Sequence, residues 1–495
     1  MLRKLLDYPL SLVEKGRPLH FLRPLVLAND NLLFEAPLNA KTAPYIRDAI
    51  DIKRWMLLVV LSLTPVILMT IWNTGLQAFV YASGDQKIMQ EFMEASISLD
   101  SYFAFVSKSN RYLTVIWMGL EIFIPIVLIS YIVGGFWEAL FACVLKRDMT
   151  EGFLVSGILY ALILPPTLPY WMIALGVSVG IVFGKEIFGG TGKNYLNPAM
   201  TCRLFLFLAF PSWMIGNVWV GTDSSTIDAS LERMNRAASL NALDGYTQAT
   251  PLANFNVSHD IKQIHVDAIA TNNLGDGVRS YSTIENQFTQ WNEAGHHQAA
   301  LGSLTQDQLK EFVTSSSGLA LAPEHYPDAY HFSSLNYGLG TDNDWGYFLG
   351  NKLGSIGETS GFAIILGALF MIYTGVASWR TMVAMGLGAF LTAFVMQSIT
   401  GPWSPAVFGF PAYKHFLLGG LLFVLVFMAT DPVTHPSTSL GKWIFGLFCG
   451  ILTIIFRILH FSFPDGIMFA ILIGNLLSPL IDRYAAFYTR WRKTV

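Results

Sequence analysis

The chain has 495 residues, of which 53% are apolar, 14% aromatic and only 13% charged, and its mean hydropathy is +0.46. Soluble proteins carry about 25% charged residues, so this composition excludes a soluble globular protein and predicts a polytopic membrane protein. The formal net charge of −3 argues against a nucleic-acid-binding protein, which would be basic. Cys143, Cys202 and Cys449 lie in apolar runs without C-x-x-C spacing, which indicates packing residues rather than an iron–sulfur or zinc site.

The first 54 residues are mixed and basic, lack the apolar run of a signal peptide, and are expected to stay in the cytoplasm. From Trp55 onward, ten apolar segments are long enough, or nearly so, to cross ~30 Å of hydrocarbon as helices. Pro125 and Gly134-Gly135 predict a kinked or broken helix in the second segment. The segments form two groups of five, near 55–78, 113–145, 153–167, 170–187 and 196–215, and near 356–376, 381–399, 413–430, 442–460 and 465–482.

The placement of basic residues predicts an orientation with both termini in the cytoplasm. Nine Lys and Arg residues lie among the first 54, and the short turns 164–169 and 461–466, which would face outside, have none. Ten spans with both ends inside fit every short loop. The basic residues placed on the cytoplasmic side are Lys146, Arg147, Lys185, Lys193, Arg380, Lys442, Arg483, Arg490, Arg492 and Lys493.

A polar segment, 216–350, separates the two groups and is expected outside the cytoplasm. It has fifteen Asp and Glu against five Lys and Arg. An odd number of spans in each group makes the halves oppositely oriented, as in an inverted repeat. The predicted fold is therefore an all-α membrane protein of about ten helices in two five-helix halves. Its predicted parts are 1–54, a cytoplasmic segment; 55–215, the first half; 216–350, the extracytoplasmic segment; 351–482, the second half; and 483–495, a cytoplasmic tail.

The sharpest short motif is DGYTQAT, residues 244–250. Taken alone, it could be an Asp-Gly turn followed by a Thr-rich loop. It also presents the hydroxyl of Thr250 with only Ala249 before it and Pro251 after it, as an accessible nucleophile requires. The pattern D-G-x-[ST]-x-A-T resembles the site at which flavin transferases attach FMN through a phosphoester bond. That site occurs in the B subunit of the Na⁺-translocating NADH:quinone oxidoreductase and in related subunits of the Rnf complex.

Further motifs resemble the same B-subunit family over most of the chain: VGGFWEALFA (133–142), FGGTGKNYLNPA (188–199), GSIGETS (354–360), ASWR (377–380), FMATDP (427–432) and PDGIMFAILIGNLLSPLID (464–482). The chain departs from the family's pattern at Gln248, where Gly is usual, and in a longer stretch at 255–340. The resemblance implies covalent FMN on Thr250, with Asp244, Thr247 and Ala249 completing the motif. It also implies non-covalent riboflavin, a quinone acceptor such as ubiquinone, and Na⁺.

FGGTGKN lacks the spacing of a phosphate-binding Walker loop, which excludes nucleotide triphosphate hydrolysis by this motif. A glycine-rich polar break between apolar spans instead indicates backbone that lines a cavity. Asn194 and Asn197 offer amide groups suited to a flavin, and the resemblance places riboflavin near them. The alternative is that both cap the next helix, with Asn197 directly before Pro198. The two interpretations are compatible.

Gly134 and Glu138 share one helix face, being four residues apart. Glycines allow a flat ring to approach the backbone, and a carboxylate can bind Na⁺ or accept protons. The resemblance implies quinone binding at Gly134 and Gly135 and sodium access at Glu138. The alternative is helix packing by small residues with Glu138 at the membrane interface.

Ionisable residues inside spans are candidates for function, which adds Glu121, Glu358 and Asp482 to the cation path. Each could instead be a paired or interfacial residue. Arg457, near the outer end of its span, is expected to extend to the interface.

The resemblance thus implies that the chain is the flavin-carrying subunit of a sodium pump in the bacterial inner membrane, working with the pump's A, C, D, E and F subunits. A flavin transferase would be needed for its maturation. The chain has no nicotinamide or iron–sulfur motif, so it is not expected to oxidise NADH alone. Two alternatives remain, namely the corresponding D subunit of an Rnf complex and a solute channel or transporter without a redox role.

Overall fold

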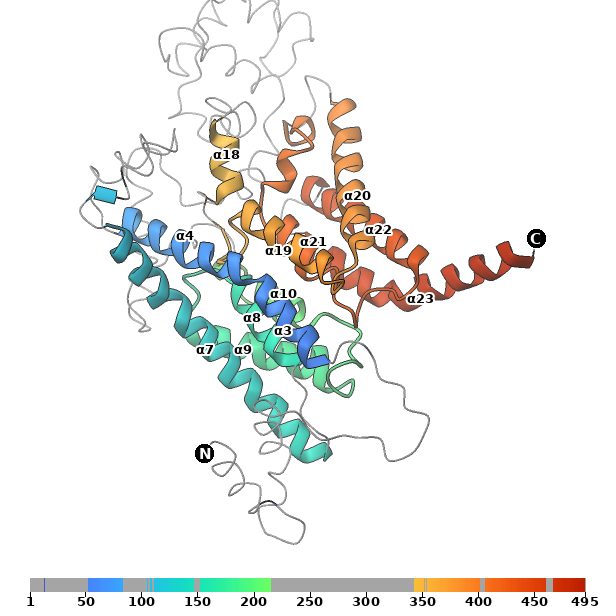
Figure 1. Cartoon of the computed structure of the whole chain (residues 1–495), viewed down its shortest axis with the longest axis horizontal. Coiled ribbons are helices and arrows are strands. Elements are labelled where there is room, and N and C mark those ends of the chain that lie inside the picture. Colours follow the sequence, from blue (N-terminus) through green and yellow to red (C-terminus); the bar gives the residue numbers. More distant parts are fainter. Residues whose placement is uncertain are drawn as a thin grey trace, which may run out of the picture.

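The computed structural model of the chain contains helices and no strands in the part that it describes (Figure 1). That part comprises mainly residues 52–82, 111–146, 152–214, 342–350, 354–400, 406–459 and 466–494. The motif DGYTQAT at 244–250 lies outside the described residues, as do most of the N-terminal segment and most of the polar segment.

The first half begins with two consecutive helices and contains the longest helix described. Its elements are α3 (Ile52–Ser62), α4 (Thr64–Ala82), α7 (Arg111–Leu145), α8 (Gly152–Leu162), α9 (Tyr170–Ile181), the π-helix η3 (Val182–Glu186), α10 (Pro198–Ala209) and α11 (Pro211–Met214). The π-helix continues α9 without a break, so 170–186 is one helical segment.

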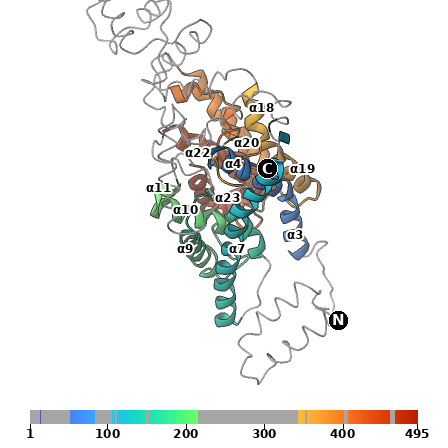
Figure 2. The same ribbon diagram turned by 90° about the vertical axis from the view of Figure 1, so that its left-hand side faces the viewer.

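The second half has longer irregular stretches between its helices. Its elements are α18 (Asp342–Leu349), α19 (Gly361–Tyr373), α20 (Trp379–Ser398), the 3₁₀ turns η6 (Ala406–Gly409) and η7 (Lys414–Phe416), α21 (Leu421–Phe427), α22 (Ser439–Leu459) and α23 (Ile467–Thr494). In two views at right angles, α7 and α9 lie on one side of the molecule and α20 and α22 on the other (Figures 1 and 2).

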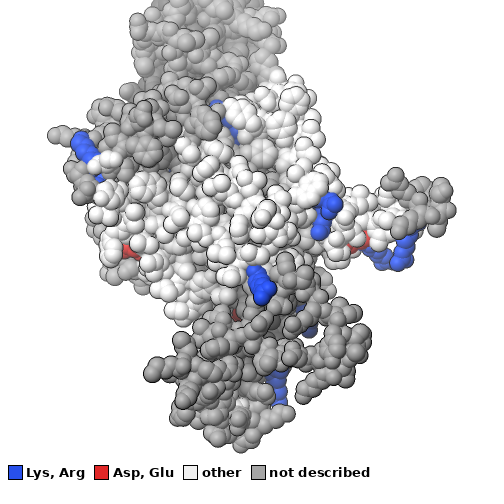
Figure 3. All heavy atoms as spheres, in the orientation of Figure 1, with Lys and Arg blue, Asp and Glu red and all other residues white. Residues whose placement is uncertain are grey.

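Five helices in the described part are long and apolar enough to cross a membrane: Arg54–Val80, Arg111–Leu145, Trp379–Ser398, Ser439–Ile458 and Ile467–Arg490. Three further apolar helices, α8, α10 and α19, are shorter. The visible surface is almost free of Lys, Arg, Asp and Glu across its middle (Figure 3). A lipid-facing band has this property, because charged side chains are costly in hydrocarbon. The chain is therefore a polytopic membrane protein.

Several predicted boundaries differ from the structure. Helix α7 is not broken, since it continues through Pro125 and the two glycines. The predicted span 413–430 contains only the seven residues of α21 as α-helix. Helix α23 runs to Thr494, so no break separates the second half from the tail at 482.

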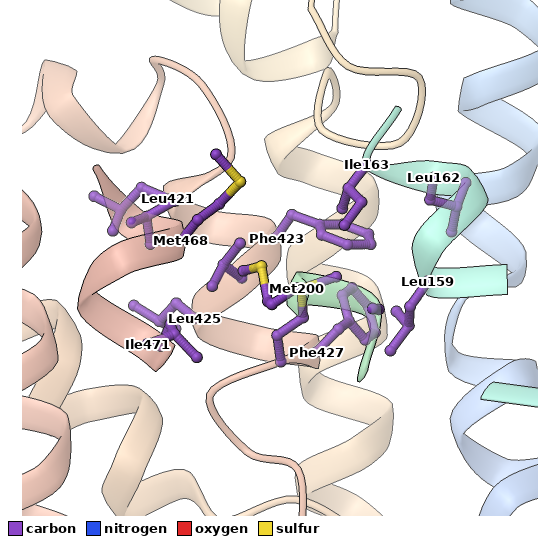
Figure 4. Packing of buried hydrophobic residues seen from close by; sticks show 14 of the residues in the cluster. Leu159, Leu162, Ile163, Met200, Leu421, Phe423, Leu425, Phe427, Met468 and Ile471 are labelled. Atoms are coloured by element: carbon purple, nitrogen blue, oxygen red, sulfur yellow. The ribbon is translucent and has the colours of Figure 1, made fainter. Parts of the chain in front are cut away.

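Helix α21 forms part of the protein core. Six of its seven residues are buried, so other elements and not lipid enclose it. Phe423 and Phe427 extend towards Leu159 and Ile163 of the α8 region, and Leu421 lies beside Met468 of α23 (Figure 4). The core therefore joins both halves around this helix.

Two irregular segments contact each other across the halves. The amide of Gly357 donates to the carbonyl of Leu162 at 2.6 Å, and that of Ile356 donates to Leu164 at 3.0 Å. Thr70 of α4 donates to the carbonyl of Ile356 at 3.1 Å. Within a membrane protein, non-helical backbone is tolerated only where protein or water satisfies it. Here, groups of the first half form hydrogen bonds with the backbone of the irregular segment in the second half.

Candidate functional site: a pocket between the two halves

A pocket lies between the two halves, and its walls come from both. The first half contributes Trp55, Met56, Val59, Gly152, Val155, Ser156, Leu159, Lys185, Thr191, Asn194, Asn197 and Pro198. The second contributes Met371, Val376, Phe427, Thr430, Asp431, Pro432 and Val433.

The glycine-rich segment before α10 forms one wall of the pocket. Gly189, Gly190 and Gly192 have backbone φ values of 113°, 90° and 85°, which residues other than glycine rarely adopt. Gly152 of α8 approaches this segment closely, because a Cβ there would be 2.4 Å from Cγ2 of Thr191. The predicted cavity-lining role of the segment agrees with this geometry.

Asn194 and Asn197 both line the pocket, and both also stabilise the chain locally. The Oδ1 atom of Asn197 accepts a hydrogen bond from the amide of Met200 at 3.2 Å, and Pro198 occupies the first turn of α10. Asn197 is therefore the helix cap that the sequence suggested. The Nδ2 atom of Asn194 donates to the carbonyl of Leu196 at 2.9 Å.

The chemistry of the pocket suits a flat, largely apolar ring with polar edges. Trp55, Leu159 and Phe427 provide apolar surface, and Thr430 and the two asparagines provide polar groups. Sites for small organic ligands combine these two kinds of lining. An isoalloxazine ring has the matching distribution of apolar faces and hydrogen-bonding edges, so the residues present fit a flavin.

A buried ion pair connects the pocket to the predicted Glu138. The Nζ atom of Lys185, which lines the pocket, is 2.6 Å from Oε1 of Glu138 and 3.8 Å from Oε1 of Glu186. The exposed fractions of Lys185, Glu138 and Glu186 are 2%, 4% and 1%. Charges buried to this extent must be paired or hydrogen-bonded. Glu138 is thus a paired residue of the protein interior and not an interfacial one.

Gly134 and Glu138 lie on the same buried face of α7, as their spacing predicts. A Cβ on Gly134 would lie 2.1 Å from Cζ of Phe153, so this glycine permits close packing of α7 against α8. A Cβ on Gly135 would meet nothing within 4 Å among the described residues. Gly134 therefore has the packing role, whereas the space beside Gly135 is open.

Asp431, after α21, faces the pocket from the second half. Its carboxylate accepts hydrogen bonds from the amide of Val433 at 3.2 Å and the hydroxyl of Thr434 at 3.0 Å. Burial raises the pKa of Asp431 above its ordinary value, although these hydrogen bonds act in the opposite direction. In the same segment, burial and the charge of Lys442 lower the pKa of His435 to about 4.

The other predicted carboxylates lie apart from the pocket lining. Glu121 is exposed on α7. Asp482 accepts hydrogen bonds from both the amide and the hydroxyl of Ser437 and of Thr438, at 2.6 to 3.0 Å. Because Thr438 also accepts from the amide of Gly441, Asp482 fixes the start of α22. The contacts of Asp482 agree with the paired alternative.

Glu358 and Arg203 form a second buried pair. Nη1 of Arg203 is 2.6 Å from Oε1 of Glu358, and Nη2 donates to the hydroxyl of Ser355 at 3.1 Å. Arg457, expected at the interface, is instead buried with an exposed fraction of 1%. Its guanidinium donates to the carbonyls of His415 and Leu418, which lie in the irregular segment before α21. Arg457 therefore donates hydrogen bonds to backbone carbonyls that lie outside the α-helices.

Known proteins resemble this chain over its whole length. A profile of the NQR2, RnfD, RnfE family matches residues 39–488. The chain belongs to this family. Within it, the chain is 46% identical to the B subunit of the Na(+)-translocating NADH-quinone reductase of Chlamydia abortus, over 100% of both chains. It is also 46% identical to that of Chlamydia pneumoniae, over 98% of both, and 36% identical to that of Stutzerimonas stutzeri, over 95% of this chain and 93% of the relative.

Membership of the NQR2, RnfD, RnfE family confirms the resemblance drawn from the motifs. The family motifs at 188–199 and 427–432 meet at the pocket, although about 230 residues separate them. The sequence did not single out Lys185, Glu186 or Asp431 as site residues. A lysine and an acidic residue beside a polar loop look like interfacial charges, and only the fold shows that they are buried.

Proposed function

We propose that the chain is the flavin-carrying membrane subunit of a Na⁺-translocating NADH:quinone oxidoreductase. Membership of the family and full-length similarity to the B subunits of such enzymes support this proposal. The protein would act with the A, C, D, E and F subunits, which would supply NADH oxidation and the iron–sulfur chemistry. The single observation that carries the flavin role is that two family motifs, distant in sequence, line one pocket whose apolar and polar side chains suit a flavin.

Electrons would enter on FMN attached to Thr250, with Asp244, Thr247 and Ala249 as the motif that the flavin transferase recognises. This part of the proposal rests on the match of 244–250 to the attachment pattern. The hydroxyl of Thr250 is the nucleophile that the phosphoester requires.

The pocket would hold riboflavin, which supplies a ring that accepts and releases electrons. Asn194 and Asn197 would bind its polar edge, while Trp55 and Phe427 would enclose its apolar faces and exclude water. The open space beside Gly135 would admit a quinone such as ubiquinone close to α7. Glu138, buried next to the pocket, would take part in the Na⁺ path, since carboxylate oxygens are the ligands that hard cations prefer.

We propose ten spans in two oppositely oriented halves in the inner membrane, with both termini in the cytoplasm. Five long helices and three shorter apolar ones support this plan. So does the meeting of the two irregular segments 163–169 and 354–360, since binding sites in inverted repeats lie where discontinuous helices meet.

The flavin role is tested with the purified full chain, produced in cells that contain the flavin transferase. On a denaturing gel, the wild-type band is expected to fluoresce under ultraviolet light because its FMN is covalent, and the Thr250→Ala band is expected to be dark. Thr222→Ala, which removes a hydroxyl elsewhere in the polar segment, is the matched control and should fluoresce. A dark wild-type band would favour a channel or transporter without a redox role.

An Rnf-type D subunit is the second candidate within the family. The full-length relatives from sodium-translocating reductases favour the sodium pump. Reconstitution of the chain with the pump's A, C, D, E and F subunits should restore Na⁺-dependent quinone reduction by NADH. If the chain instead restored activity only to an Rnf complex that lacks its own D subunit, the alternative would be correct.

A further inference from the structure

We propose that Lys185 is the counter-charge that links the redox state of the pocket's flavin to the carboxylate of Glu138. This inference rests on the proposed function, because it requires a flavin in the pocket. Lys185 lines the pocket and donates to Glu138 at 2.6 Å. It is the one cationic side chain among the described residues that line the pocket.

The π-helix explains how Lys185 reaches both places. In η3 the amide of Ile187 donates to the carbonyl of Val182, five residues earlier, at 3.0 Å. The wider turn buries the consecutive residues Gly184, Lys185 and Glu186. In a regular α-helix, consecutive side chains point about 100° apart. Short π-helices are frequently found at functional sites.

The three buried groups lie close together. Among the described residues, two carboxylates, those of Glu138 and Glu186, lie within 4 Å of the ammonium of Lys185. The side chains are enclosed by protein, since at most 4% of any of the three residues is exposed. Electrostatic interactions are strong in such a setting, where solvent does not screen them. A change of charge in the pocket will therefore act on the ion pair.

The coupling step moves charge without making or breaking a covalent bond. A flavin bound in the pocket would supply a ring that carries one more negative charge once it is reduced by one electron. The ammonium of Lys185 would then be attracted towards that ring. The attraction weakens the hold of Lys185 on Glu138, whose carboxylate is then better able to bind a cation. Lys185 thus favours electron uptake and prepares Glu138 for Na⁺.

The test measures the midpoint potential of riboflavin in the purified full chain carrying Thr250→Ala, which removes the covalent flavin. Lys185→Gln should shift the potential to more negative values, because it removes the positive charge beside the ring. Glu138→Gln should shift it to more positive values, because it leaves the charge of Lys185 less neutralised. Lys185→Arg should keep it near that of the parent. Lys193→Gln, which removes an exposed charge from the glycine-rich segment that follows η3, should leave the potential unchanged.

Two further measurements keep the test decisive. If Lys185→Gln cannot be purified, the potentials of Glu138→Gln and of the double variant Lys185→Gln/Glu138→Gln are compared with that of the parent chain instead. The double variant should have a potential between those of the two single changes. Equal potentials in the parent and Glu138→Gln chains, with riboflavin still bound, would overturn the role of Lys185 and leave the flavin pocket standing. Absence of riboflavin from the denatured parent chain would overturn both.

Discussion

Among the described residues, one buried ion pair joins elements that are distant in sequence and belong to different halves. Arg203 of α10 and Glu358, before α19, are 155 positions apart, and their side chains meet at 2.6 Å. This ion pair favours the observed packing of the two halves, because separating them would leave a buried charge without its partner, which costs far more than leaving an exposed charge unpaired. The buried ions thus specify how the two halves fit together.

Loss of one member of this pair should destabilise the chain strongly. Glu358→Ala leaves the guanidinium of Arg203 buried without its carboxylate, which is expected to cost about 3–5 kcal/mol. Thermal unfolding of the purified chain in detergent measures the effect. Glu121→Ala, which removes an exposed carboxylate from α7, is the control and should change stability little. Equal unfolding temperatures for the two variants would show that the pair contributes little.

The pKa of His435 predicts how stability depends on pH. Its pKa is about 4 in the folded chain and 6.5 in the unfolded chain, so protonation favours unfolding. The penalty is absent above pH 6.5 and increases as the pH falls towards 4. His435→Gln should therefore gain about 1–2 kcal/mol relative to wild type at pH 5, and nothing at pH 8. Unfolding temperatures of both proteins at the two pH values measure this difference, and a difference independent of pH would contradict it.

At the scale of elements, glycines determine how closely helices can approach. Gly75 of α4 and Gly119 of α7 face each other's helix, and a Cβ on either would lie 1.9 Å from a backbone carbonyl oxygen. Backbone cannot move aside as a flexible side chain can. The crossing of α4 and α7 therefore depends on these two positions.

Gly75→Ala should destabilise the chain by about 1–3 kcal/mol, as overpacking does. Gly386→Ala in α20 provides the control, because a Cβ there would meet its nearest atoms at 3.8 and 3.9 Å. Thermal unfolding in detergent compares the two. Equal unfolding temperatures for Gly75→Ala and Gly386→Ala would show that α4 and α7 can move apart without a loss of stability, which would contradict the prediction.

Hydropathy predicted the long helices well but not the irregular segments. Helices α7, α20 and α22 lie within a few residues of their predicted ranges, because exposure to lipid requires a long apolar run. The apolar run 413–430 is mostly not α-helical, because it is enclosed by protein, and apolar composition cannot distinguish that setting from lipid. The cavity-lining role of Asn194 and Asn197 was predictable, since a polar break between apolar runs requires partners.

Lys185 could not be identified as a site residue from the sequence. Its place near a polar loop matches the positive-inside pattern, and the π-helix that buries it leaves no signal in the residue order. Asp431 likewise lies between an apolar run and a loop, where carboxylates are usually solvated. Their meeting at one pocket follows from the packing of the two halves.

At the scale of the whole molecule, the pocket lies where the two halves meet, and this location suits a carrier of electrons through a membrane. Its walls come from both halves, and most of its polar groups come from the irregular segments between helices. A flavin there would be shielded from water by the apolar core around α21 (Figure 4). Movement of one half relative to the other would alter the pocket and its ion pair together.

The most direct test of this account is the riboflavin content of the purified chain after a pocket-filling substitution. Ser156→Trp places a large ring in the pocket from α8, whereas Leu154→Trp places the same ring on the exposed face of that helix. Denaturation should release riboflavin from the wild-type and Leu154→Trp chains but not from Ser156→Trp, and all three should keep the fluorescence of covalent FMN. Riboflavin retained by Ser156→Trp at the wild-type level would contradict the proposal that this pocket is the flavin site.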